Sequence, residues 1–186
     1  VLQGGYKAFR EQVRNDLETL PLRFDYTVVA GRTGSGKTRL LQALAAQGAQ
    51  VLDLEGLAQH RGSVLGGLPH DPQPTQRAFE TRLWHALSGF DPSRPVFVES
   101  ESRKIGQRQV PEALLDHMRR EGRVLVVEMP DTARVQLLLE EYGFFAQQLE
   151  RFCAHLDTLV EMRGRDTVTQ WQALARAGRW AEVFGE

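Results

Sequence analysis

The sequence contains a single cysteine, Cys153, and lacks long hydrophobic runs. One thiol cannot form a disulfide within the chain, so the sequence predicts a protein of a reducing compartment, the cytoplasm. Its longest apolar runs, such as residues 124–127, are far shorter than the roughly 20 apolar residues that cross a bilayer. These absences exclude a disulfide-stapled miniprotein and predict a chain that does not span a membrane.

Lysine is also scarce, because the 23 basic residues include only Lys7, Lys37 and Lys104 as lysines. The net charge of −1 gives no general attraction for nucleic acid. The excess of arginine has two possible origins: the base composition of the gene, or contacts with phosphate or RNA, which the planar guanidinium favours. Composition alone does not choose between them.

The 186 residues, 41% of them hydrophobic, suit one folded domain. Short apolar runs predict strands at residues 24–30, 50–54, 95–99 and 123–128, and helical patterns predict helices at residues 6–20, 37–47, 75–88 and 111–121. Such alternation is typical of a parallel sheet covered by helices on both faces. From about residue 132 only helical patterns occur, with breaks near Gly143, Gly164 and Gly178. The sequence predicts an α/β fold of three layers, followed by a helical C-terminal region.

Residues 31–38, Gly-Arg-Thr-Gly-Ser-Gly-Lys-Thr, match the phosphate-binding loop (P-loop, Walker A). Glycines let the backbone N–H groups converge on an anion, and the following helix adds positive charge at its N-terminus. Lys37 is expected to neutralise phosphate and the Thr38 hydroxyl to bind Mg²⁺. The predicted phosphate-binding residues are Gly31, Gly34, Ser35, Gly36, Lys37 and Thr38, and the motif makes the fold P-loop NTPase-like.

Acidic residues follow two of the predicted strands. Glu99 and Glu101 end the third strand, where P-loop proteins place a carboxylate that holds Mg²⁺ directly or through water. Glu99 is the first candidate for this role and Glu101 the second. Asp53 and Glu55 follow the second strand, where open α/β sheets bind substrate.

Basic and polar residues near these strand ends are further candidates for substrate or RNA contacts. Arg103 and Lys104 can clamp a diphosphate or an RNA backbone. The long segment before the third predicted helix is of the length typical of functional lids. The candidates it contributes are Arg61, Ser63, Gln73 and Gln76. Arg134, in the first turn after the fourth strand, is a further candidate phosphate contact.

These residues leave several functions open. An ATP- or GTP-hydrolysing module would use Glu99 to position water. A small-molecule kinase would use the helical region after residue 132 as a lid. A tRNA-binding module without a ligand in the loop is a further alternative.

Six segments together resemble the bacterial tRNA 2-selenouridine synthase family. They include the P-loop, a Leu-Glu-Gly segment, His-Arg-Gly-Ser, Gln-Pro-Thr-Gln and Glu-Ser-Arg-Lys-Ile-Gly, and they lie at residues 4–7, 31–38, 51–58, 60–63, 73–76 and 99–106. The resemblance covers almost the whole chain. It implies a two-domain enzyme, in which a rhodanese-like domain with a catalytic cysteine precedes a P-loop domain.

The resemblance also implies a domain division and a missing partner. Residues 1–20 would be the end of the rhodanese-like domain and a linker helix, residues 21–142 the P-loop domain, and residues 143–186 a helical extension. A chain that begins at Val1 is expected to be a piece of a longer protein. Cys153 does not occupy the rhodanese motif, so this chain alone is not expected to complete the selenium step.

The implied activity is a transferase reaction that modifies tRNA carrying 2-thiouridine at the wobble position. The sulfur is geranylated from geranyl diphosphate and then replaced by selenium from selenophosphate. Under this interpretation the P-loop holds the departing diphosphate, and Lys37, Arg103 and a Mg²⁺ ion held by Thr38 and Glu99 stabilise its charge. Contacts to substrate or tRNA would come from Asp53, Glu55, Arg61, Ser63, Gln73, Gln76, Glu101, Arg103, Lys104 and Arg134.

Overall fold

The computed structural model describes residues 4–61 and 72–185, so the predicted contact at Ser63 lies outside the described residues. The chain forms two compact units. The first comprises the residues up to Gly31 together with Lys37–Val126, and the second comprises Arg32–Gly36 and Val127–Glu186. The domain boundaries expected from the sequence remain predictions.

A four-stranded parallel sheet organises the first unit, in the order β2-β3-β1-β6. Val28 of the central strand β1 lies opposite Val98 of β3 and Val124 of β6. All four strands end at the same edge, and β1 leads directly into the P-loop segment. The strands are β1 (Tyr26–Ala30), β2 (Gln50–Leu52), β3 (Val96–Glu99) and β6 (Arg123–Val126).

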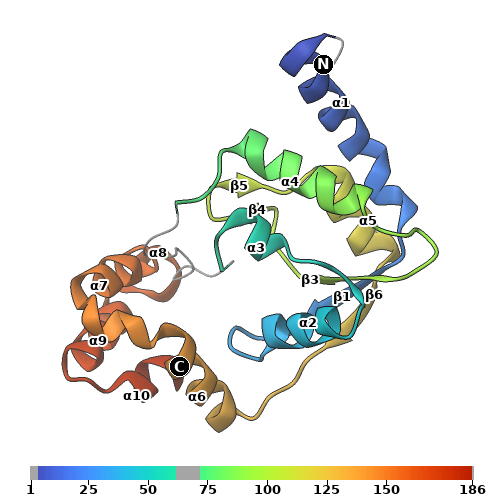
Figure 1. Ribbon diagram of the computed structural model, residues 1–186. Coiled ribbons are helices and arrows are strands. Elements are labelled where there is room, and N and C mark those ends of the chain that lie inside the picture. Colours follow the sequence, from blue (N-terminus) through green and yellow to red (C-terminus); the bar gives the residue numbers. More distant parts are fainter. Residues whose placement is uncertain (1–3, 62–71, 186) are drawn as a thin grey trace. The chain divides into compact units, whose positions relative to one another are not determined.

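Helices cover the sheet, with α2 on one face and α4 and α5 on the other (Figure 1). Their fully buried side chains, such as Phe79, Leu83 and Leu114, pack with Phe24 and Leu52 in one core. The helix α1 ends where Pro21 enters a 3₁₀ turn, because proline cannot donate the next helical hydrogen bond. The helical segments of this unit are α1 (Gly5–Thr19), η1 (Leu20–Arg23), α2 (Lys37–Ala46), α3 (Leu54–Ala58), α4 (Gln76–Ser88) and α5 (Glu112–Glu121).

Two short elements of the first unit were not predicted. The helix α3 is capped at its N-terminus by Asp53, whose Oδ1 accepts a hydrogen bond from the Gly56 N–H at 2.8 Å. A β-hairpin of two-residue strands follows the sheet strand β3, with β4 at Lys104–Ile105 and β5 at Arg108–Gln109. Both elements are too short to leave a clear hydrophobic period in the sequence.

The second unit is helical from Asp131 onward, as predicted. Aromatic rings form much of its core, and those of Phe145 and Phe152 lie 5.2 Å apart between centroids. Cys153 is buried here, and burial raises the pKa of its thiol. The predicted breaks at Gly164 and Gly178 fall between helices, and Gly143 begins the 3₁₀ turn that follows α6. The helical segments are α6 (Asp131–Tyr142), η2 (Gly143–Gln147), α7 (Leu149–Asp157), α8 (Val160–Arg163), α9 (Arg165–Arg176) and α10 (Trp180–Gly185).

The predicted α/β class is confirmed, and the fourth predicted strand is more exposed than its apolar residues suggest. The side chains of Val124, Leu125 and Val126 are 65%, 43% and 60% exposed. Strand β6 is at the edge of the sheet, next to β1 alone. Among residues 4–61 and 72–185, no helix combines the length and apolar character needed to cross a membrane.

Candidate functional site

The loop between β1 and α2 has the backbone that a P-loop requires. Gly34 and Gly36 have φ angles of 78° and 83°, a region that side chains rarely adopt. The Ser35 N–H donates to the Arg32 carbonyl at 3.0 Å, which closes the turn. The Ser35 hydroxyl is buried, and in the part of the chain that the structure describes it has no hydrogen-bond partner. A buried hydroxyl of this kind suits a ligand that accepts a hydrogen bond.

Lys37 and Glu99, two of the site residues proposed from the sequence, are brought together. The Lys37 Nζ donates to the Gly31 carbonyl at 3.0 Å and lies 3.8 Å from the Glu99 Oε1. Their side chains are only 13% and 6% exposed. The two residues meet because α2 begins and β3 ends at the same edge of the parallel sheet.

Three carboxylates gather at this edge. Glu55 of α3, Glu99 at the end of β3 and Glu101 just beyond it each place one oxygen within 4.8 Å of the others. Burial, followed by the charges of neighbouring carboxylates, raises the pKa of Glu55 to about 8 and that of Glu101 to about 7, while Lys37 opposes both shifts. Such a group favours a bound proton or a cation.

The raised pKa of Glu55 predicts a pH-dependent effect of the Glu55→Gln substitution. Because the folded-state pKa lies above the ordinary value of 4.5, ionisation of Glu55 destabilises the fold as pH rises toward about 8. Relative to the parent chain, the variant should therefore gain thermal stability at pH 8 and not at pH 4.5. Melting curves at the two pH values measure this gain. For a chain of this length, each 1 kcal/mol of added stability raises Tm by roughly 2–4 °C.

The control for this prediction is Glu121→Gln, on the exposed surface of α5. Its effect on Tm should be much smaller than that of Glu55→Gln at pH 8. An equal gain in Tm from Glu55→Gln at both pH values would contradict the claim that ionisation of the buried Glu55 carboxyl destabilises the fold.

The remaining residues predicted to contact substrate or tRNA lie in several different parts of the structure. Asp53 caps α3, whereas Arg103, just before the hairpin, and Lys104, in its first strand, are exposed. Arg61 is partly buried next to the undescribed segment. Arg134 lies in the second unit, where its Nε donates to the Asp131 Oδ1 at 3.3 Å and its guanidinium also contacts the Gly185 carbonyl. Direct contacts of these residues with substrate stay predictions.

The side-chain amides of Gln73 and Gln76 hold the hairpin in place. Gln73 donates to the carbonyls of Ala58 and Ile105 at 3.1 and 3.0 Å, and it accepts from the Gln107 N–H at 2.8 Å. Gln76 donates to the Gln109 carbonyl at 2.8 Å and accepts from the N–H of the same residue at 2.9 Å. From the sequence, both glutamines were predicted to contact substrate or tRNA. Their role in positioning the hairpin was not predicted.

Gly106 lies at the tip of the hairpin, where any side chain is expected to clash with its neighbours. Its φ is 57°, and a Cβ there would lie 2.4 Å from the Gln73 Oε1 and 2.7 Å from the His60 Cδ2. Gly106→Ala should therefore lower the free energy of unfolding by about 1–3 kcal/mol, measured by urea denaturation.

The matched control is Gly89→Ala, at the end of α4. A Cβ at Gly89 would make only ordinary contacts, the nearest at 3.5 Å, and its φ of −88° is open to any residue. Equal stability of the two variants would show that the Gly106 site tolerates a side chain.

The parallel sheet, the glycine-rich loop at its central strand and the Lys37–Glu99 pair define a P-loop NTPase-like α/β domain. Residues 24–172 match the family described as the tRNA 2-selenouridine synthase AAA domain. The chain belongs to this family.

Relatives in the family are similar over most of the chain. The tRNA 2-selenouridine synthase of Hydrogenovibrio crunogenus is 43% identical over 78% of the chain and 41% of its own length. Those of Sulfurovum sp. and Shewanella loihica are 37% and 40% identical over 85% and 95% of the chain, and 42% and 45% of their own lengths. The chain thus spans less than half the length of these relatives. No solved structure matches it significantly.

Proposed function

We propose that this chain is the P-loop domain of a tRNA 2-selenouridine synthase, a cytoplasmic transferase, and that it binds the diphosphate of geranyl diphosphate together with tRNA. The observation that carries the proposal is the Lys37–Glu99 pair, largely buried where the P-loop enters α2. The family supplies the reaction, and the loop supplies a site for its leaving group.

The first step places developing negative charge on the diphosphate. The sulfur of wobble 2-thiouridine attacks C1 of the geranyl group, the C1–O bond breaks, the uridine releases its N3 proton to solvent, and diphosphate leaves. Backbone N–H groups of the loop and Lys37 stabilise that charge without moving, which is the most effective form of electrostatic catalysis. The exposed Arg103, beside the carboxylate edge, adds a cation for the same group.

Mg²⁺ fits the donors at this edge. Oxygen ligands are those that Mg²⁺ prefers, and three carboxylates of the first unit place oxygens within 4.8 Å of one another. Thr38 and Glu99 would hold the ion, which would neutralise phosphate oxygens when bound. The cation would also relieve the mutual repulsion that raises the pKa values of Glu55 and Glu101.

Selenium transfer requires more than this chain. In the proposed second step the selenium of selenophosphate attacks C2 of the S-geranylated uridine, the C2–S bond breaks with release of geranylthiol, and hydrolysis of the Se–P bond releases phosphate. The family resemblance implies that a rhodanese-like domain with a catalytic cysteine takes part in this step. The one cysteine here, Cys153, is buried in the helical second unit. We therefore assign the geranyl half-reaction to this chain, with the rhodanese-like domain as its partner.

The roles of the carboxylates can be separated by substitution. We expect Glu99→Gln to weaken the Mg²⁺-dependent part of geranyl diphosphate binding about tenfold or more, because a neutral amide is a poor Mg²⁺ ligand. The measurement is isothermal titration calorimetry with and without Mg²⁺. Glu101→Gln is the matched variant and should have a smaller effect. A larger effect of Glu101→Gln would transfer the metal-binding role to Glu101.

Nucleotide hydrolysis is the second candidate function. Glu99 is buried and close to Lys37, the arrangement in which an NTPase positions water beside a nucleotide. Under this alternative, ATP or GTP would occupy the loop in place of a prenyl diphosphate. Phosphate release from ATP or GTP in the presence of Mg²⁺, abolished by Lys37→Ala, would favour it.

A further inference from the structure

The side-chain amide of Gln76 bonds the hairpin as a neighbouring strand would. Its Nε2 donates to the Gln109 carbonyl at 2.8 Å, and its Oε1 accepts from the Gln109 N–H at 2.9 Å. Gln109 lies directly opposite Lys104 in the register of the hairpin. Because a two-stranded hairpin is only marginally stable by itself in water, the position of Lys104 depends on contacts from outside the hairpin, of which the Gln76 amide is one.

The orientation of the Gln76 amide is set by Glu80, one helical turn further along α4. The Gln76 Nε2 also donates to the Glu80 Oε1 at 3.1 Å. An ionised carboxylate only accepts hydrogen bonds, so the NH₂ of the amide must face Glu80. That orientation leaves the second N–H for the Gln109 carbonyl and the amide oxygen for the Gln109 N–H. An amide turned the other way would point its oxygen at two acceptors.

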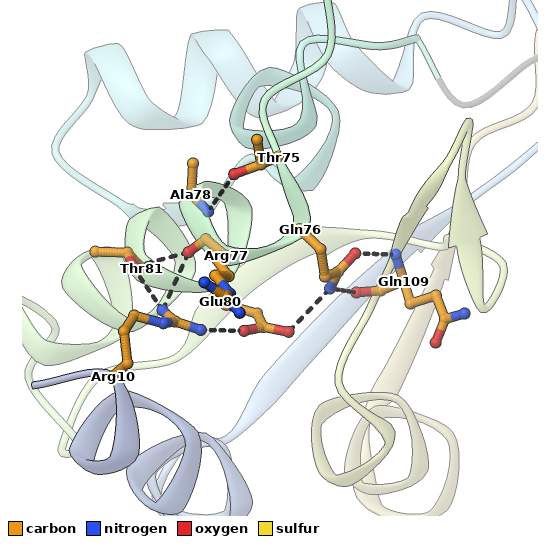
Figure 2. Close-up of polar contacts among 8 residues, drawn as sticks. All are labelled: Arg10, Thr75, Gln76, Arg77, Ala78, Glu80, Thr81 and Gln109. Atoms are coloured by element: carbon orange, nitrogen blue, oxygen red, sulfur yellow. Dashed lines mark hydrogen bonds and ion pairs between the residues drawn. The ribbon is translucent and has the colours of Figure 1, made fainter. Parts of the chain in front are cut away.

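Glu80 is itself held by Arg10 of α1 (Figure 2). The Arg10 Nη2 pairs with Oε2, the other oxygen of the carboxylate, and the two side chains are only 10% and 21% exposed. The same guanidinium donates to the Thr81 Oγ1 at 2.7 Å and to the Arg77 carbonyl at 3.1 Å. Both oxygens of Glu80 are therefore used, and each accepts from a different side chain.

Two exposed cations depend on where the hairpin lies. Arg103 comes two residues after Glu101, one of the three clustered carboxylates, and Lys104 begins strand β4. The Arg103 carbonyl accepts from the Val110 N–H at 3.0 Å, so the backbone of both cations is tied to the hairpin. A cation contributes most to binding when its backbone is already held where the anion will lie.

We propose that Glu80 and Gln76 are positioning residues, which fix the hairpin so that Arg103 and Lys104 reach the phosphate groups of the ligand in the P-loop. This inference rests on the proposed function in one respect, that a diphosphate occupies the loop. Neither positioning side chain needs to touch the ligand, because both act through the backbone of Gln109 and the strand paired with it.

Glu80→Gln tests this network with almost no change of side-chain shape. A glutamine offers one acceptor where the carboxylate offers one each to Arg10 and Gln76, so one of these donors must lose its partner. In hydrogen exchange followed by NMR, the Gln109 N–H should exchange about tenfold faster or more in the variant. The Val96 N–H of β3, which reports unfolding of the sheet, should keep the rate of the parent chain. Unchanged exchange at Gln109, or equal acceleration at both N–H groups, would overturn the positioning role.

A double-mutant cycle separates positioning from a general loss of structure. In calorimetry with geranyl diphosphate and Mg²⁺, Glu80→Gln should weaken binding about fivefold, and Arg103→Ala/Lys104→Ala about tenfold or more. In the Arg103→Ala/Lys104→Ala background, Glu80→Gln should weaken binding by less than about twofold, because the cations through which it acts are gone. The control is Glu121→Gln, on the exposed surface of α5, which should leave the affinity unchanged in both backgrounds. Fully additive effects would overturn the proposal.

The outcomes distinguish this proposal from the proposed function. If geranyl diphosphate binds the parent chain and Glu80→Gln equally well, the proposed function stands and the positioning role is overturned. If the parent chain binds ATP and ignores geranyl diphosphate, the proposed function fails, and the same cycle with ATP decides the positioning role. Non-additive loss of ATP affinity in that cycle would uphold the positioning of the two cations for a nucleotide.

Discussion

Lys37→Ala is expected to weaken geranyl diphosphate binding by more than about 100-fold, because a largely buried charge-assisted contact contributes roughly 1.5–3 kcal/mol and its loss also leaves Glu99 facing the anion. In the structure the Lys37 Nζ lies between the Gly31 carbonyl at 3.0 Å and the Glu99 carboxylate at 3.8 Å. The ammonium group is thus held at the loop before any ligand arrives. Isothermal titration calorimetry measures the loss.

The same substitution removes a cation beside a buried carboxylate, so stability and binding must be separated. Lys37→Ala/Glu99→Gln removes both charges and should restore the melting temperature without restoring diphosphate affinity. Arg119→Ala, on the exposed surface of α5, is the control for the loss of a positive charge. Diphosphate affinity in Lys37→Ala equal to that of the parent chain would remove the P-loop assignment.

Gln73→Ala is expected to destabilise the first unit by about 2–4 kcal/mol and to lower Tm by roughly 5–15 °C. The Gln73 amide makes three hydrogen bonds that join α3 to the hairpin, so its removal leaves two carbonyls and one N–H without their partner. Thermal unfolding followed by circular dichroism measures the change.

Gln109→Ala is the matched control for this prediction. The backbone of Gln109, and not its exposed side chain, bonds Gln76, so truncation of that side chain should change Tm little. If the two glutamine variants melted at the same temperature, the hairpin would not depend on the Gln73 amide.

Local patterns in the sequence predicted the parts of the site that lie within or beside regular elements. The P-loop motif required a strand before it and a helix after it, and β1 and α2 are found there. The expectation that a carboxylate at the end of another strand lies near the P-loop rested on the common edge of parallel strands, and Glu99 lies 3.8 Å from the Lys37 Nζ. Gly34 and Gly36 have the positive φ angles that the motif implies.

Contacts between residues distant in the chain were beyond such reasoning. Gln73 bonds Ile105, 32 residues away, and nothing in the spacing of the two residues indicates it. The short helix α3 brings Glu55 to Glu99 and Glu101, whereas Asp53, an equal candidate from the sequence, serves as its cap. The position of β6 at the edge depends on strand order, which a hydrophobic run does not encode.

The central claim is that the P-loop of this chain holds a prenyl diphosphate, and the most direct measurement is calorimetric titration with geranyl diphosphate, ATP and GTP, each with and without Mg²⁺. The account predicts micromolar binding of geranyl diphosphate, far weaker binding of both nucleotides, and loss of the signal in Lys37→Ala. Tight binding of ATP or GTP with no response to geranyl diphosphate would contradict it and identify a nucleotide-hydrolysing module instead.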